Sequence, residues 1–159
     1  MSKLFNLQNK NVLLTGASKG MGLAMAKGLV SHGANVVISS RKLDQCEKAS
    51  DVINESVGQE KAFAFACNAS SKDELNTLVD FSVSKLGSIT TLVCNAGVNS
   101  FFGSMSEIDD ESYDKTMDTN VKSNHWLINM VKPSMKESGG GSIMITSSIA
   151  AFHASETLG

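Results

Sequence analysis

The sequence predicts an α/β fold in which a doubly wound parallel sheet is covered by helices on both faces, as three layers. Three observations lead to this prediction. Short, strongly apolar runs alternate with helix-forming segments along the whole 159-residue chain, the pattern of repeated strand-helix-strand units. A glycine-rich turn follows the first apolar run. The composition, 42% hydrophobic and 19% charged, is that of one globular domain, residues 1–159.

The first expected elements form a strand-helix-strand unit. Residues 11–15 are apolar enough for a buried strand, and residues 20–32 follow the glycine turn as a helix. Gly33 ends this helix, because glycine readily adopts the conformation that stops one. Residues 35–39, Asn-Val-Val-Ile-Ser, form the second strand.

The alternation continues through the middle of the chain. Residues 42–57 are expected to be helical and residues 62–66 to form a short strand. The helix expected over residues 71–86 begins Ser-Ser-Lys-Asp-Glu, in which a serine hydroxyl can cap the first turn. Residues 89–94 form the fourth strand.

The last expected elements are a long helix and a fifth strand. The helix runs from residue 110 to about residue 135 and carries Pro133 near its end. Three consecutive glycines then stop it before the strand expected over residues 142–146.

The order of the strands follows from their composition. Strands this apolar, separated by helices, belong in a parallel sheet that is buried on both faces. Right-handed crossovers then give the strand order 3-2-1-4-5. In such sheets ligands bind beyond the carboxyl ends of the strands, near the switch point between the first and fourth strands.

The first of these carboxyl ends carries a phosphate-binding pattern. Gly16, Gly20 and Gly22 have the spacing G-x-x-x-G-x-G between the first strand and its helix. Gly16 allows the sharp turn, Gly20 lets backbone N–H groups approach a pyrophosphate, and Gly22 lets the helix pack closely on the sheet. The partial positive charge of the helix N-terminus then faces the anion.

The charge and the apolar pattern exclude several kinds of partner. The chain has 14 Lys and Arg against 16 Asp and Glu, a net charge of −2, and no basic stripe of the kind that binds nucleic acid. It has no signal-peptide pattern and no apolar run long enough to span a membrane. We therefore expect a cytoplasmic protein whose partners are small molecules.

The cysteines and histidines give no sign of a metal site. They are Cys46, Cys67, Cys94, His32, His125 and His153. Their wide spacing fits neither a zinc site nor a disulfide framework. We expect no metal and a reducing compartment.

A competing interpretation of the glycine turn is the nucleophile elbow of hydrolases. Gly16-Ala-Ser-Lys-Gly20 also satisfies G-x-S-x-G between a strand and a helix. That elbow normally follows several strands, whereas this turn follows the first. No Asp and His stand at later strand ends to complete a triad, so we disfavour this interpretation.

Four motifs stand at the expected positions together: Thr15-Gly16 opening the glycine turn, Asn95-Ala-Gly97 after the fourth strand, Asn120 within the long helix, and Ser148 after the fifth strand. This set resembles the short-chain dehydrogenase/reductase family, of the NADP-preferring type, over essentially the whole chain.

The resemblance implies roles for individual residues. Ser148 would hydrogen-bond the substrate carbonyl, and Asn120 would hold a water in the proton relay while distorting its helix. Asn68 stands where the family usually has an aspartate that contacts the adenine. The cofactor-binding residues implied in this way are Gly16, Ser18, Lys19, Gly20, Met21, Gly22, Ser40, Arg41, Lys42, Asn68, Ala69, Asn95, Ala96 and Gly97.

The end of the second strand favours NADP(H) over NAD(H). An acidic residue there typically binds the ribose hydroxyls of NAD, whereas an arginine accommodates the 2′-phosphate of NADP. This chain has Arg41 and Lys42 and no acid before Asp44. Lys19, in the glycine turn, adds a second cation in reach of the same phosphate.

One part of the family pattern is absent from the 159 residues. The proton donor of the family is the tyrosine of Tyr-x-x-x-Lys, about thirteen residues beyond the active serine, where it acts as a general acid. Counting from Ser148 carries it just past Gly159. Tyr113 is the only tyrosine, and Met117 stands four residues after it. We therefore expect the C-terminal part of the family fold to be missing, which would expose an apolar face and the edge of the fifth strand.

Three explanations for this stay open: a part of a longer enzyme, a non-catalytic remnant, or a chain completed by another polypeptide. The resemblance implies an oxidoreductase that transfers a hydride between NADP(H) and a carbonyl or secondary alcohol, with the given chain alone inactive. In its full-length form it would be a homo-oligomer, a dimer or tetramer. The alternative function is a non-catalytic module that binds NADP.

Overall fold

A parallel sheet lies at the centre of the computed structural model, which describes residues 5–153 and 156–157. The strands are β1 (Asn11–Thr15), β2 (Asn35–Ser40), β3 (Ala62–Ala66), β4 (Thr91–Cys94) and β5 (Ser142–Ile145). All neighbouring strands pair in parallel in the order β3-β2-β1-β4-β5. The strand order predicted from the sequence is therefore confirmed. The two ends of the expected domain, residues 1–4 and 158–159, and residues 154–155 lie outside the described residues.

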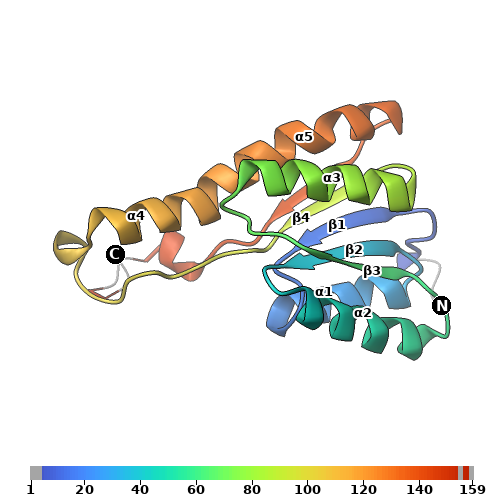
Figure 1. Ribbon diagram of the computed structural model, residues 1–159, viewed down its shortest axis with the longest axis horizontal. Coiled ribbons are helices and arrows are strands. Elements are labelled where there is room, and N and C mark those ends of the chain that lie inside the picture. The colour runs from blue at the N-terminus through green and yellow to red at the C-terminus, as the bar shows by residue number, and fades with distance from the viewer. Residues whose placement is uncertain (1–4, 154–155, 158–159) are drawn as a thin grey trace.

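Helices cover both faces of this sheet (Figure 1). On one face lie α1 (Gly20–Ser31) and α2 (Leu43–Val57), and on the other lie α3 (Lys72–Leu86) and α5 (Ser123–Glu137). This arrangement gives the three layers that the alternating sequence predicts, because right-handed crossovers place successive helices on the two faces.

Alternate side chains of β1 enter two separate apolar clusters. Val12 and Leu14 pack with side chains of α1 and α2, whereas Leu13 packs with those of α3 and α5. All three are at most 1% exposed. A strand buried on both faces needs apolar residues at every position, which explains the continuous apolar run in the sequence.

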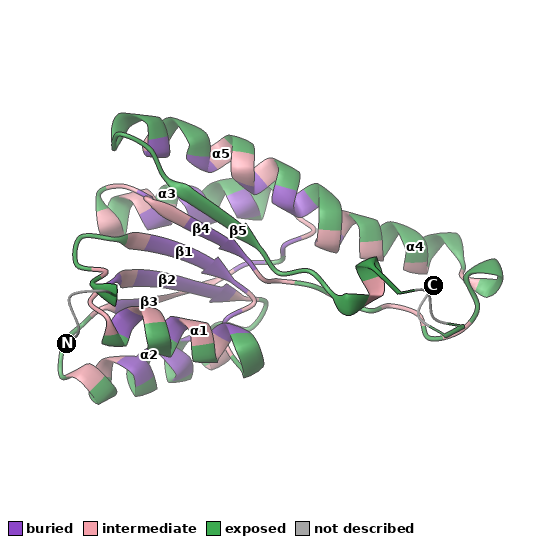
Figure 2. Cartoon of the chain, turned by 180° about the vertical axis from the view of Figure 1, so that it is seen from behind, coloured by how far each residue is buried: buried purple, intermediate pink, exposed green. Residues whose placement is uncertain are grey.

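The strand β5 differs from the others because its residues are exposed (Figure 2). Ile143, Met144 and Ile145 are 42%, 48% and 52% exposed. The strand pairs with β4 along one side only, so its other side presents unpaired backbone groups at the edge of the described sheet.

Several boundaries differ from the predicted ones by a few residues. The strand β2 extends to Ser40, and α2 begins at Leu43 instead of residue 42. The fourth strand begins at Thr91, not residue 89. Before this strand, Thr90 bonds its neighbours through backbone and side chain: its N–H donates to the Asn11 carbonyl at 2.9 Å, and its hydroxyl accepts from Asn11 N at 2.9 Å.

The single long helix predicted over residues 110–135 is divided into three parts. These are α4 (Asp110–Met117), a π-helical turn (Asp118–Lys122) and α5. The Asp109 carboxylate caps α4 by accepting a hydrogen bond from Ser112 N at 2.7 Å. After α5, Gly139 and Gly140 have φ angles of +83° and +121°, which end the helix as the sequence predicts. Short 3₁₀ helices span Met105–Glu107 and Ile149–Ala151.

Candidate cofactor-binding site

A cleft of about 760 Å³ lies at the carboxyl ends of the strands, where the fold class predicts a ligand site. Its walls come from the turn after β1, the end of β2 and the loops after β3 and β4. The C-terminal part of α4 and the π-helical turn that follows it complete them. The lining residues are Gly16, Ser18, Lys19, Ser40, Arg41, Lys42, Gln45, Cys67, Asn68, Ala69, Ser70, Asn95, Ala96, Gly97, Val98, Lys115, Asp118 and Thr119.

Most of the residues expected to bind a cofactor therefore lie along one cleft. Gly20, Met21 and Gly22, together with the catalytic candidates Asn120 and Ser148, are not among its lining residues. The sequence did not single out Ser70, Lys115 or Thr119. Ser70 and Thr119 stand next to residues that it did single out, Ala69 and Asn120.

The glycine turn requires two of its glycines for steric reasons. Gly16 has a φ of +65°, and a Cβ there would lie 2.8 Å from the Ala96 Cα. At Gly22 a Cβ would collide with the Gly16 carbonyl oxygen and lie 2.8 Å from Asn95 Nδ2. The turn thus packs directly on the loop after β4. The N-terminus of α1 stays open because Lys19, its N-cap residue, makes no side-chain cap, and the first N–H groups of α1 can therefore receive an anion.

Asn95, directly after β4, forms hydrogen bonds to the carboxyl ends of β1 and β5. Its Nδ2 donates to the carbonyl oxygens of Thr15 and Gly16 at 3.2 and 3.0 Å, and its Oδ1 accepts from the Thr146 hydroxyl at 3.2 Å. The Thr15 hydroxyl in turn accepts from the backbone N–H groups of Asn95 and Ala96, both at 3.1 Å. The Asn95 side chain thus shapes the cleft by hydrogen-bonding the backbone at the end of β1.

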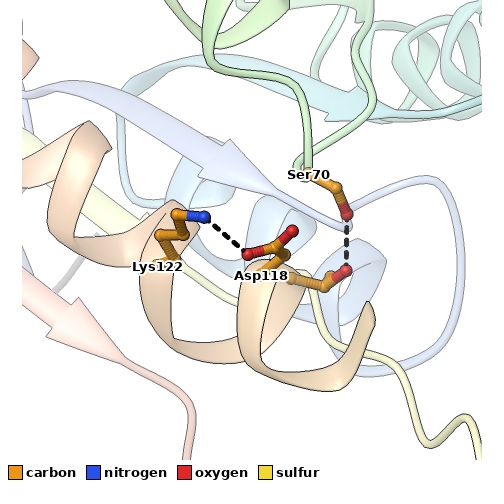
Figure 3. A network of polar contacts seen from close by, with 4 residues as sticks. Ser70, Asp118 and Lys122 are labelled. Atoms are coloured by element: carbon orange, nitrogen blue, oxygen red, sulfur yellow. Dashed lines mark hydrogen bonds and ion pairs between the residues drawn. The ribbon is translucent and has the colours of Figure 1, made fainter. Parts of the chain in front are cut away.

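Cations dominate the charge around the cleft. Lys19, Arg41 and Lys42 line it as the sequence predicts, and Lys115 of α4 adds a fourth. The acid in the lining is Asp118, whose carboxylate forms an ion pair with Lys122 at 2.9 Å (Figure 3). This charge distribution favours an anionic ligand.

The loop after β3 brings Asn68 to the cleft with part of its hydrogen-bonding capacity used. The Asn68 side-chain oxygen accepts a hydrogen bond from Ser70 N at 3.2 Å, and its backbone N–H donates to Glu74 Oε2 at 2.8 Å. An amide oxygen has two lone pairs, so one is left to accept from an adenine amino group.

Asn120 lies in the π-helical turn and contacts the loop after β4. Its Oδ1 accepts from Val98 N and its Nδ2 donates to Val98 O, both at 2.8 Å. The expected distortion of its helix is confirmed, since Ser123 N donates to the carbonyl of Asp118, five residues earlier. Through these two bonds Asn120 positions the backbone of a cleft-lining residue.

Ser148 is exposed and stands beyond β5 at the start of the short 3₁₀ helix. Its hydroxyl oxygen accepts from Ala150 N at 3.2 Å, which leaves the hydroxyl hydrogen to donate. Tyr113 is 45% exposed on α4 and is not among the cleft-lining residues.

The cysteines are held as neutral thiols. Burial raises the pKa of Cys67, which lines the cleft, to about 12, with a smaller contribution from the Glu74 carboxylate. Burial also raises the pKa of Cys94 to about 11. Thiolate chemistry at neutral pH is therefore disfavoured. Within residues 5–153 and 156–157, no cluster of His, Cys, Asp or Glu is arranged to hold a metal.

None of the helices in the described part of the chain is both long enough and apolar enough to cross a membrane.

Comparison with known proteins identifies relatives along nearly the whole chain. A family model described as short chain dehydrogenase matches residues 10–158. Dehydrogenase/reductase SDR family member 4 of Homo sapiens is 39% identical over 153 residues, which cover 96% of this chain and 54% of the relative. The protein of the same name from Caenorhabditis elegans is 36% identical over 145 residues, which cover 91% and 55% of the two chains. The chain spans about half the length of these curated relatives.

Solved structures share the fold. A 7α-hydroxysteroid dehydrogenase complexed with NADH and 7-oxo glycochenodeoxycholic acid is 34% identical with a TM-score of 0.89, and the match covers 96% of this chain and 58% of that one. A metagenomic short-chain oxidoreductase in complex with NADP is 29% identical with a TM-score of 0.87, covering 96% and 68%.

Proposed function

We propose that this chain, which belongs to the short-chain dehydrogenase/reductase family, is the dinucleotide-binding domain of an enzyme that transfers a hydride between NADP(H) and a carbonyl or secondary alcohol. The observation that carries the proposal is the cleft itself. It combines an uncapped helix N-terminus after a glycine turn with cations at the end of β2.

The pyrophosphate of the cofactor would lie on the glycine turn. The first backbone N–H groups of α1 would donate to it, and at Gly20, which has nothing within 4 Å of its Cβ position, a phosphate has room to approach the backbone. On the sheet side, Asn95 keeps this turn and the loop after β4 in a fixed relation through its bonds to Thr15 and Gly16.

Arg41, Lys42 and Lys19 would hold the 2′-phosphate that distinguishes NADP from NAD. All three line the cleft and none forms an ion pair in the described part of the chain, so their charges are available to a ligand. Arg binds phosphate through two parallel N–H donors, and such charge-assisted bonds are about twice as strong as neutral ones. Asn68 and Ala69 would contact the adenosine from the loop after β3.

The chemistry combines residues of this chain with residues beyond it. When bound, the nicotinamide supplies or accepts the hydride. Ser148 would donate its hydroxyl hydrogen to the substrate carbonyl oxygen and so stabilise the charge that develops there. Asn120 would act on the proton relay through the position of Val98. The proton donor itself would come from a Tyr-x-x-x-Lys segment outside these 159 residues.

A titration of the chain with NADPH and NADH tests this function. We expect tighter binding of NADPH, and a selective loss of NADPH affinity in Arg41→Ala by roughly 10- to 100-fold, because a charge-assisted contact contributes about 1.5–3 kcal/mol. Lys48→Ala is the matched control, since Lys48 is an exposed cation of α2 that does not line the cleft. Equal or tighter binding of NADH would overturn the proposed preference.

The alternative function is a module that binds NADP without turnover. Activity measurements on material of confirmed intact mass separate the two. Turnover by the protein in its natural length would eliminate the binding module, whereas tight NADPH binding by an inactive full-length protein would support it.

A further inference from the structure

A hydroxyl pair connects two walls of the cleft that are distant in sequence (Figure 3). Ser70 Oγ, in the loop after β3, lies 2.7 Å from Thr119 Oγ1, in the π-helical turn, and 49 residues separate the two. Thr119 is only 7% exposed. Both residues line the cleft.

The π-helical turn that carries Thr119 is held by side chains on its own helix. The Ser123 hydroxyl donates to the Thr119 carbonyl at 2.6 Å, and Asn124 Nδ2 donates to the Asn120 carbonyl at 2.7 Å. Both Ser123 and Asn124 are buried. The Ser123 hydroxyl satisfies the Thr119 carbonyl, whose usual donor, Ser123 N, bonds the Asp118 carbonyl instead. The two side-chain bonds hold the turn in one shape.

The same turn also holds the loop after β4. Asn120 binds both backbone polar atoms of Val98, so Thr119 and Asn120, adjacent in sequence, contact different loops. In the sheet, β2 and β1 lie between β3 and β4, which places the ends of these two strands about 14 Å apart. The π-helical turn therefore bridges loops that the sheet itself keeps apart.

We propose that Thr119 is a positioning residue. Through its bond to Ser70 it keeps the loop after β3, the adenosine-side wall of the cleft, at a fixed spacing from the wall formed by Asn120 and Val98. This role rests on the proposed function, because it assigns the two walls to two ends of one dinucleotide. Thr119 touches no reacting atom. Its hydroxyl fixes the spacing of the walls, so a ligand that spans the cleft depends on it more than a ligand that occupies one end.

The test is NADPH binding by Thr119→Val, which keeps the side-chain shape and removes the hydroxyl, and by Ser70→Ala. Each is expected to raise the Kd for NADPH by about 3- to 10-fold, since a typical hydrogen bond contributes in that range. The double variant should bind no worse than either single variant, because the two changes remove the same bond. Thr119→Ser should restore binding. Thr77→Val is the matched control, because the Thr77 hydroxyl bonds its own helix, to Asp73 O at 3.0 Å, and Thr77 does not line the cleft.

Adenosine 2′,5′-bisphosphate distinguishes bridging from a local effect. Because it occupies only one end of the cleft, it should lose less affinity than NADPH in Thr119→Val. Equal losses for both ligands, additive losses in the double variant, or unchanged NADPH affinity in Ser70→Ala would each overturn the proposal. If Thr119→Val does not fold, as judged by circular dichroism, Ser70→Ala decides. Absence of NADPH binding by the wild-type chain would instead refute the proposed function, and the bridging role with it.

Discussion

At the scale of single residues, Gly22 shows how closely the glycine turn is packed. A Cβ at this position would meet the Gly16 carbonyl oxygen and lie 2.8 Å from both Ala17 Cα and Asn95 Nδ2. Two of these contacts are backbone, which cannot move without shifting the turn. Gly28, in the same helix, has nothing within 4 Å of its Cβ position. One helix thus contains a glycine required by packing and a glycine in open space.

This contrast gives a paired prediction. Gly22→Ala should lower the free energy of unfolding by about 1–3 kcal/mol, the range for overpacked sites, and should weaken NADPH binding because α1 must move. Gly28→Ala should raise the free energy of unfolding by about 0.5–1 kcal/mol through helix propensity. Urea denaturation measures both, and a neutral Gly22→Ala would show that the turn tolerates displacement.

The buried thiols predict a loss of stability at alkaline pH. The pKa of Cys67 is raised from 9.0 to about 12, so between these values the native chain keeps a proton that the unfolded chain releases. Proton release then favours unfolding, and the stability present below pH 9 is lost as the pH rises. Cys67→Ala should therefore give a flatter dependence of unfolding free energy on pH from 8.5 upward. Parallel profiles for the two proteins would refute this.

Residue types were more predictable than residue contacts. The glycines and the cations Arg41 and Lys42 could be identified from the sequence. The conformational freedom of a glycine and the charge of an arginine or lysine depend on the residue type and not on the fold. The bond of Asn120 to Val98 spans 22 residues, and that of Thr119 to Ser70 spans 49. Contacts of this kind depend on the completed fold, so residue type and local spacing do not reveal them.

At the scale of elements, the sheet and most helices followed from apolar periodicity, whereas the division of the long helix did not. The π-helical turn (Asp118–Lys122) adds one residue to a turn without interrupting the helical pattern. The family resemblance predicted a distortion at Asn120, but its extent required the structure. Here Ser123 and Asn124 stabilise the turn, because their side chains bond the carbonyls of Thr119 and Asn120.

The edge strand β5 is a second element in which prediction and structure can be compared. The sequence predicts an apolar strand whose edge is exposed when the C-terminal part of the family fold is missing, and Ile143, Met144 and Ile145 are exposed along that edge. Apolar side chains on an exposed sheet edge favour association with further structure. We infer that in the protein of full length this edge is covered.

At the scale of the whole molecule, the length of the chain determines whether it can catalyse a reaction as well as bind a cofactor. Because the chain spans about half of its curated relatives, we expect the 159 residues alone to bind NADPH but to reduce no carbonyl above background. General acid catalysis contributes about 10²- to 10⁴-fold, and the chain lacks the tyrosine that would supply it. A protein extended to the length of the relatives should gain turnover and form a dimer or tetramer, as measured by activity assay and light scattering. Ser148→Ala should abolish that turnover while leaving NADPH affinity unchanged.

Two outcomes would contradict this prediction. Robust turnover by the 159-residue chain of confirmed mass would show that the proton donor lies within it. An extended protein that remains monomeric would show that the exposed edge of β5 is covered by the chain itself and not through association.

Dinucleotide binding in the cleft can be tested by mapping the backbone amide chemical shifts of the isotope-labelled chain during titration with NADP⁺. We expect the largest changes in the glycine turn, at Arg41 and Lys42, and in the loops after β3 and β4, with smaller changes at Arg41 and Lys42 when NAD⁺ is used instead. Changes confined to another surface, such as the groove between α3 and α5 lined by Val83 and Met130, or no saturable change with either dinucleotide, would contradict it.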